Sequence, residues 1–248
     1  CGIAELLLAR GFLVSGSDVK ANANTRRLSE LGVQVFVGHM ASNISDVDLV
    51  VYSSAISEDN PEFKAAKSMG IQLVPRAKML GWLMSFSKGV AVSGTHGKTT
   101  TTGLIIHILL HAGLDPSYAI GGELKGVNRY ACLGQGSCFI AEADESDASF
   151  LYLTPDIAVV TNIEQDHMGT YDDCINKLQD TFSKFIHKIP STGLAVLSID
   201  DPRVSLLAQS LNCRVVTVGL AALADVRAHC VRQEGLKRLF SLTIMGKT

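Results

Sequence analysis

A glycine, lysine and threonine motif follows an apolar segment in the stretch VAVSGTHGKTTTTG, residues 90–103. Backbone N–H groups of a glycine-rich turn at a helix N-terminus bind anions, and the helix dipole assists them. Lys98 can reach the β- and γ-phosphates of a nucleotide, and the Thr99 hydroxyl can ligate Mg²⁺. These residue types in this order predict a site for nucleotide phosphates.

The motif departs from the usual phosphate-binding loop in two ways. The usual first glycine stands five positions before the second, but that position here is Val92, and the extra glycine is Gly94. The β-branched threonines at 99–102 also favour a strand over a helix. The alternative is therefore a strand-to-helix turn with a solvated lysine. The apolar patterns on both sides of the loop favour the phosphate site.

A cluster of carboxylates follows the predicted strand SCFIAEA, within EADESDASF at residues 142–150. Such a cluster is most often a solvated loop. Ligands of open α/β sheets, however, bind at the carboxyl ends of the strands, and the glycine loop leaves its own strand at that edge. A carboxylate there can hold Mg²⁺ that bridges nucleotide phosphates. Glu142 is the first choice because it is nearest the strand end; Asp144, Glu145 and Asp147 are weaker candidates.

A third polar segment, TNIEQDHMGTY at residues 161–171, follows another predicted strand at the same edge. His167 can ligate a metal with its ring oriented by a neighbour such as Asp166. A lone histidine is usually structural, but the two other polar segments at this edge favour ligation. His96, inside the glycine loop, can also lie close to the phosphates.

Short apolar segments alternate with amphipathic ones along the whole chain, which predicts an α/β fold with a parallel sheet. In the first part we expect helices at 2–11, 24–32, 61–70 and 76–86 and strands at 12–18, 34–38, 48–55 and 71–74. In the second part we expect helices at 99–114, 174–189 and 201–211, strands at 89–94, 137–143, 155–163, 193–200 and 213–219, and a hairpin at 225–245. The strand at 12–18 is expected to be buried, and the helix at 99–114, which is apolar almost all round, to be buried against a sheet. A domain boundary is expected near residues 87–88.

Composition limits the classes of function. The 248 residues carry a net charge of −2, which gives no electrostatic reason to expect nucleic acid or an anionic membrane as a partner. No apolar run is long enough for a membrane span, and no leader pattern is present, so we expect a cytoplasmic protein. The 6 cysteines form no C-x-x-C pair, and we expect them to be reduced, buried and without a metal or redox role.

Together the motifs resemble the Mur ligase family, the ATP-dependent amide-forming ligases of peptidoglycan synthesis. GTHGKTTTT is similar to that family's variant phosphate loop, and EADESDASF and TNIEQDHMGTY look like the member that adds the first amino acid. GIAELL, SGSD, GH at 38–39, YSSAIS and PRAKML resemble the N-terminal domain in the right order. The resemblance implies a Rossmann-like domain at 1–87 and a central P-loop ATPase domain at 88–248. It implies ATP and Mg²⁺ as cofactors and UDP-N-acetylmuramate and L-alanine as substrates, which are joined through an acyl phosphate.

The resemblance also implies roles for single residues. ATP phosphates would contact the loop and its first helical turn: Gly94, Thr95, His96, Gly97, Lys98, Thr99 and Thr100. Thr99 and Glu142 would ligate a first Mg²⁺ and His167 a second, while Asn162 would lie near the reacting end of the sugar substrate. Asp18, His39 and Ser53 are similar to positions that meet the uridine.

Two segments of the family pattern are expected outside the 248 residues: a first strand with its diphosphate-binding glycine loop, and a C-terminal ligase domain. Two alternatives therefore remain open. The protein can be a ligase that adds a later amino acid, although the DESDASF and DHMGTY details argue against this. The chain can also be a fragment that binds a nucleotide or a UDP-sugar and ligates nothing.

Overall fold

The structure, a computed structural model, describes residues 1–122, 129–166 and 168–246. The α-helices are α1 (Gly2–Ala9), α2 (Ala23–Glu30), α3 (Pro61–Met69), α4 (Arg76–Met84), α5 (Lys98–His111), α6 (Ile175–Ile186) and α7 (Pro202–Leu207). Short 3₁₀ helices are η1 (Ala41–Ile44), η2 (Ser149–Tyr152), η3 (Met168–Tyr171) and η4 (Ala208–Ser210). The strands are β1 (Ser15–Asp18), β2 (Gln34–Val37), β3 (Leu49–Tyr52), β4 (Gln72–Pro75), β5 (Lys88–Ser93), β6 (Ser117–Ala119), β7 (Ala131–Cys132), β8 (Cys138–Glu142), β9 (Ile157–Val160), β10 (Leu194–Ser198), β11 (Arg214–Gly219), β12 (Val226–Glu234) and β13 (Lys237–Ile244).

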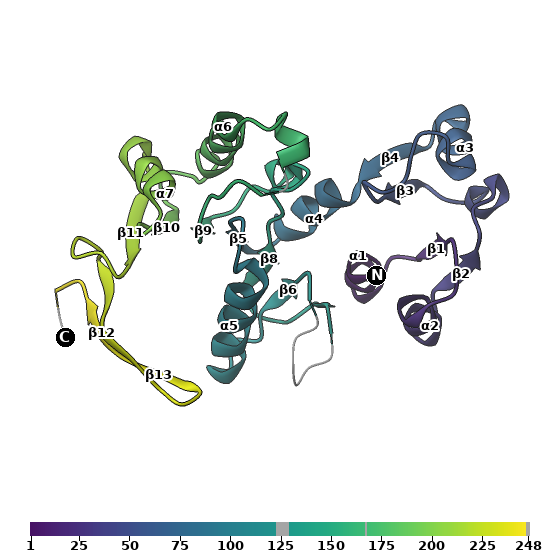
Figure 1. Ribbon diagram of the computed structural model, residues 1–248. Coiled ribbons are helices and arrows are strands. Elements are labelled where there is room, and N and C mark those ends of the chain that lie inside the picture. Colours follow the sequence, from purple (N-terminus) through teal and green to yellow (C-terminus); the bar gives the residue numbers. More distant parts are fainter. Residues whose placement is uncertain (123–128, 167, 247–248) are drawn as a thin grey trace.

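The N-terminal part contains two separate pairs of parallel strands, with β1 beside β2 and β3 beside β4 (Figure 1). Parallel pairing was predicted, but the division into two pairs was not. Local signals fix the helices between the strands. Asn22 and Thr25 form a capping box at the start of α2. Asn60 caps α3 and Pro61 is its first residue, while Gly70 ends it in the left-handed conformation.

The predicted buried strand at 12–18 forms a strand only from Ser15 to Asp18, and none of its residues is buried. Phe12 and Leu13 are 47% and 103% exposed, and the strand begins only at Ser15. These residues belong to the C-terminal turn of α1, because Gly11 has a φ of +87° and Phe12 N–H donates to Leu7 C=O at 3.1 Å. This pattern is a Schellman motif, in which the Phe12 N–H satisfies the carbonyl of Leu7.

The second part is a nine-stranded sheet in the described residues, with the order β13-β12-β11-β10-β9-β5-β8-β6-β7 (Figure 1). Strands β12, β11, β10, β9, β5, β8 and β6 run parallel to one another, while β13 is antiparallel to β12 and β7 is antiparallel to β6. The chain leaves β5 toward β6 and later crosses back to β9 on the other side, so strand order reverses at β5. The carboxyl end of a strand at such a switch point is where α/β sheets bind ligands.

Both faces of this sheet are covered. Val90 and Ile140 pack with Ile106 of α5 on one face, while Ala91 and Phe139 belong to the larger core that contains residues of α4 and α6. Burial on both faces explains why β5 and β8 are apolar without alternation. The phosphate loop therefore follows a strand that is packed on both of its faces.

One expectation about burial is confirmed and another is wrong. Helix α5 packs one stripe against β5 and β8 as expected, and Leu104 and Ile108 outside that stripe are 59% and 66% exposed. The six cysteines are free as expected, but Cys1 and Cys230 are exposed and the other four are half-buried. Within the described ranges, every helix falls short of the length and apolarity that a bilayer-spanning segment needs.

Candidate active site

The loop between β5 and α5 turns at its two glycines. Val92 is fully buried in the extended strand β5, and its carbonyl accepts a hydrogen bond from Ala143 N–H at 2.9 Å. The strand thus continues through the position where the usual loop has a glycine. The turn begins later, at Gly94 with a φ of +135°, and ends at Gly97 with a φ of +82°, directly before α5. Both values favour glycine.

Close approach of the neighbouring loop also requires glycine at 94. A Cβ atom there would lie 2.0 Å from Thr161 Oγ1 and 3.0 Å from Asn162 N. No side chain fits at such distances without movement of the loop that follows β9. The two loops are therefore built against each other at the carboxyl edge of the sheet.

Asn162 holds the backbone of His96 at both ends. Its Oδ1 accepts a hydrogen bond from His96 N–H at 2.8 Å, and its Nδ2 donates to His96 C=O at 3.0 Å. Thr161 Oγ1 donates to the same carbonyl at 2.7 Å. These bonds fix the conformation of the phosphate loop from outside it. The contacts give Asn162 a positioning role in the loop, in addition to the substrate contact expected from sequence.

Lys98 is folded back over the loop. Its Nζ donates to the carbonyls of Gly94 and Thr95 at 2.7 and 3.1 Å, and to Glu145 Oε1 at 3.0 Å. Glu145 Oε2 lies 2.7 Å from Nζ as an ion contact, without hydrogen-bond geometry. The three protons of the ammonium group therefore have three acceptor groups.

Thr99 and Glu142 meet as the sequence predicted. Thr99 Oγ1 donates to Glu142 Oε1 at 2.9 Å, and Glu142 Oε2 accepts from Gly121 N–H at 2.8 Å. Two oxygens in adjacent positions of an octahedron, each about 2.1 Å from Mg²⁺, lie about 3.0 Å apart. A hydroxyl and a carboxylate at 2.9 Å thus fit one edge of a magnesium shell. Among the described residues, no cluster of three or more histidine, cysteine or acidic side chains forms a metal site.

Glu145, a weaker candidate for Mg²⁺ in the sequence, is the carboxylate that contacts Lys98. It is 1% exposed, and burial raises its pKa above the usual value, while the hydrogen bond from Lys98 acts in the opposite direction. The Tyr171 hydroxyl donates to the Glu145 carbonyl. Burial, and to a smaller extent the neighbouring carboxylate of Glu145, raise the pKa of Tyr171 to about 12. The acidic loop is therefore anchored to η3, which begins directly after residue 167.

A hollow of about 230 Å³ lies over the phosphate loop. It is lined by the predicted residues Thr95, His96, Gly97, Lys98, Thr99, Thr100 and Glu142. The ring of His96 is 55% exposed, with Nε2 at 3.8 Å from Glu164 and 3.9 Å from Asp166. The sequence thus identified the residues around this hollow, and the structure brings them together. His167 lies outside the described residues.

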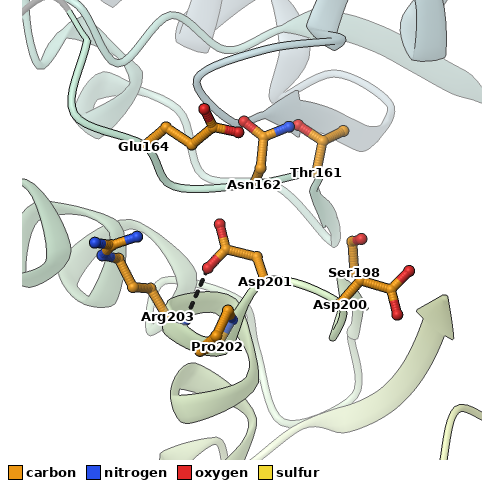
Figure 2. Close-up of a pocket in the computed structure, with 8 residues that line it drawn as sticks. All are labelled: Thr161, Asn162, Glu164, Ser198, Asp200, Asp201, Pro202 and Arg203. Atoms are coloured by element: carbon orange, nitrogen blue, oxygen red, sulfur yellow. Dashed lines mark hydrogen bonds between the residues drawn. The ribbon is translucent and has the colours of Figure 1, made fainter. Parts of the chain in front are cut away.

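A second hollow, of about 380 Å³, lies between the loop after β9 and the start of α7 (Figure 2). Its acidic side chains already have structural partners. Asp201 accepts hydrogen bonds from Ile163 N–H at 2.7 Å and from Arg203 N–H at 2.8 Å. Asp200 accepts from Leu220 N–H at 2.8 Å. The Asp201 bonds tie the loop that carries Asn162 to the start of α7, and the Asp200 bond ties the end of β10 to the turn after β11.

The predicted uridine-binding residues lie in the N-terminal part. Asp18 and His39 stand at the ends of neighbouring strands, and Gly38 N–H donates to the Asp18 carbonyl at 2.8 Å. His39 Nδ1 lies 3.0 Å from Ser17 Oγ and 3.3 Å from Glu62 Oε2. Ser53 is exposed after β3, and its hydroxyl accepts from Ala55 N–H at 3.3 Å.

Sequence reasoning missed Glu62, which organises this cluster. Ser17 Oγ and Asn43 Nδ2 both donate to its carboxylate at 2.6 Å. The side chain of Glu62 is only 13% exposed. Its position in the first turn of a helix begun by Asn60 and Pro61 indicated a favourable charge at a helix start. Nothing in that pattern indicated contact with Ser17 of β1, His39 after β2 and Asn43 of η1.

Comparison with known proteins matches the chain to the models of one protein family. Residues 1–97 match the Mur ligase family, catalytic domain, and residues 92–244 match the Mur ligase middle domain. The UDP-N-acetylmuramate–L-alanine ligase of Pelobacter propionicus is 49% identical over 245 residues, which are 99% of this chain and 53% of that protein. The ligase of the same name from Aromatoleum aromaticum is 51% identical over 241 residues, 97% of this chain and 51% of that protein.

A solved ligase structure has a similar fold. The UDP-N-acetylmuramate–alanine ligase from Thermotoga maritima is 26% identical, with a TM-score of 0.85, and the match covers 99% of this chain and 55% of that one. The chain therefore spans about half the length of the curated relatives it matches.

Proposed function

Because the chain belongs to the Mur ligase family, we propose that the whole protein joins L-alanine to UDP-N-acetylmuramate with ATP, in peptidoglycan synthesis. The relatives named for this reaction are about half identical to the chain. The observation that carries the proposal is the pairing of Thr99 with Glu142 at 2.9 Å beside the glycine loop. We assign residues 1–87 to the UDP-sugar domain and 88–248 to the ATP domain, and the reaction to the cytoplasm, where ATP is available.

The proposed reaction has two steps. A carboxylate oxygen of the muramyl group attacks the γ-phosphorus of ATP, which releases ADP and leaves an acyl phosphate. The amine of L-alanine then attacks the acyl carbon, loses a proton, and expels inorganic phosphate from a tetrahedral intermediate. In the first step charge builds on the transferred phosphoryl group, and preorganised donors and cations lower the free energy of that transition state.

The chain's own residues are proposed to serve the first step. Backbone N–H groups of Gly97 and of the first turn of α5 bind phosphate oxygens, and Lys98 supplies a positive charge. Thr99 and Glu142 hold Mg²⁺, which neutralises charge on the β- and γ-phosphates when bound. Asn162 keeps the loop in its binding conformation through His96.

Two further assignments belong to the proposal. Asp18, His39 and Ser53 contact the uridine, and the polar cluster around Glu62 supports the position of the His39 ring. His167, outside the described residues, is proposed as a ligand of a second Mg²⁺ ion because of its place between Asp166 and η3.

The experiment measures phosphate release by the full-length protein with ATP, Mg²⁺, UDP-N-acetylmuramate and a panel of amino acids. L-alanine should support turnover far better than the amino acids added later in peptidoglycan synthesis. Lys98→Ala should abolish turnover while circular dichroism and thermal melting show an intact fold. Near-normal ligation by this variant, or preference for another amino acid, contradicts the assignment.

A further inference from the structure

The ammonium group of Lys98 has no proton left for a phosphate. It has three protons, and the structure gives it three acceptor groups: the carbonyls of Gly94 and Thr95 and the carboxylate of Glu145. A phosphate oxygen that binds Lys98 must therefore take the place of one of these acceptors.

The two carbonyls are poor candidates for release. Both belong to the loop backbone, whose conformation is fixed by the Asn162 bonds to His96 and by the Thr95 N–H bond to the Asn162 carbonyl at 3.1 Å. Glu145 approaches with a flexible side chain, and its carboxylate resembles phosphate in charge and in acceptor chemistry. The carboxylate is thus the acceptor that a phosphate can replace.

We propose that Glu145 is an internal counter-ion that competes with the β- and γ-phosphates of the nucleotide for Lys98. The proposal rests on the proposed nucleotide site and adds a residue that controls its affinity and its discrimination among nucleotides. Only nucleotides whose phosphates reach Lys98 meet this competition, so AMP is not affected by it.

The surroundings of Glu145 hold the carboxylate in place for this exchange. Its backbone carbonyl accepts from Tyr171 of η3, and Thr170 Oγ1 donates to Ser146 C=O at 2.6 Å. Phe150, later in the same loop, stacks on Phe185 with ring centroids 4.7 Å apart. The charged and titratable groups around the carboxylate are Lys98, Asp144 and Tyr171. Lys98 is the only cation among these three, so Glu145 loses its compensating charge when Lys98 turns to a phosphate.

Calorimetric titration of the 248-residue chain with ATP, ADP and AMP in the presence of Mg²⁺ tests the proposal. Glu145→Gln keeps the shape of the side chain and removes the charge. It should lower the Kd for ATP and ADP on the order of tenfold, since one charge-assisted bond to Lys98 no longer competes. The Kd for AMP should not change. Glu145→Asp withdraws the carboxylate by one methylene and should also tighten ATP binding, which keeps the proposal testable if the Gln variant does not fold.

Asp147→Asn is the matched control. It removes one carboxylate from the same loop, but Asp147 is exposed and accepts a hydrogen bond from Ser149 N–H at 2.9 Å. Its Kd for ATP should stay within about twofold of the wild-type value, because screened surface charges contribute little. An equal gain in this control contradicts a specific competition with Lys98.

The remaining outcomes separate the two proposals. If the wild-type chain binds ATP and Glu145→Gln binds it equally or more weakly, Glu145 is not a competitor, while the nucleotide site stands. If neither protein binds ATP, the proposed nucleotide site is wrong, and the role of Glu145 falls with it. If only the variant binds ATP, both proposals are supported.

Discussion

The side-chain amide of Asn162 spans one peptide unit on each side of His96, accepting from its N–H at 2.8 Å and donating to its carbonyl at 3.0 Å. The phosphate loop is thereby held by the strand end next to its own. Residues outside the glycine motif consequently determine whether the loop can bind an anion.

Asn162→Ala should weaken ATP binding on the order of tenfold, because the loop N–H groups lose their preorganised directions. The thermal melting temperature should fall only slightly, since the site is at the surface edge of the sheet. Nucleotide titration calorimetry measures the effect. Glu164→Gln, a change in the same loop at an exposed side chain, is the control and should bind ATP normally. Equal ATP affinity of Asn162→Ala and wild type contradicts the positioning role.

Gly94→Ala should destabilise the chain by about 2–4 kcal/mol, because the new Cβ needs both an unfavourable backbone conformation and displacement of Thr161. Chemical denaturation followed by circular dichroism gives the free energy of unfolding. Gly16→Ala is the matched control, since a Cβ there meets no atom within 4 Å. A Gly94→Ala variant as stable as Gly16→Ala is incompatible with the observed approach of the two loops.

Glu62→Gln should weaken binding of UDP-N-acetylmuramate severalfold and leave ATP binding unchanged. The carboxylate accepts from Ser17 and Asn43 and lies beside His39, so its loss frees the His39 ring to turn. Titrations with each ligand measure the two affinities. Glu58→Gln, which breaks only an exposed ion pair with Lys67, should change neither affinity. An unchanged sugar affinity in Glu62→Gln removes Glu62 from the site.

Stability should fall as pH rises above 10. The pKa of Tyr171 is raised from 10.0 to about 12, chiefly by burial, so the folded state keeps a proton that the unfolded state loses in this window. The stabilising contribution is complete below pH 10 and is lost toward pH 12, on the order of 1 kcal/mol. Tyr171→Phe should show a shallower decline of unfolding free energy between pH 10 and 12, on the order of the same contribution. Equal declines of the unfolding free energy in the wild type and in Tyr171→Phe contradict this role of Tyr171. Tyr118, whose pKa burial also raises to about 12, accounts for the slope that remains.

Much of the fold and the phosphate loop could be predicted because their signals are local. Glycines, caps and apolar segments act within a few residues, and Thr99, Lys98 and the loop glycines are contiguous. Glu142 was predicted from its position at a strand end. Which carboxylate in the cluster is buried depends on contacts with Lys98 and Tyr171, 47 and 26 residues away, so the contact of Glu145 with Lys98 could not be predicted.

Burial itself was the least predictable property. A helix such as α5, with apolar residues on several of its faces, does not reveal how many faces meet a partner, and Leu104 and Ile108 are exposed. The segment at Phe12 and Leu13 has the composition of a strand, but Gly11 lets α1 end in a turn that includes Phe12. The contact of Glu62 with His39 joins elements 23 residues apart, and no local pattern records it.

The central claim is that Thr99 and Glu142 hold Mg²⁺ beside the phosphates of ATP, and the Mg²⁺ dependence of ATP binding tests it most directly. ATP titrations of the wild-type chain and of Glu142→Gln should be run with Mg²⁺ and with EDTA. Mg²⁺ should tighten binding of ATP to the wild-type chain at least about tenfold, and Glu142→Gln should lose this gain. A Glu142→Gln variant that keeps the full gain from Mg²⁺ would contradict the account.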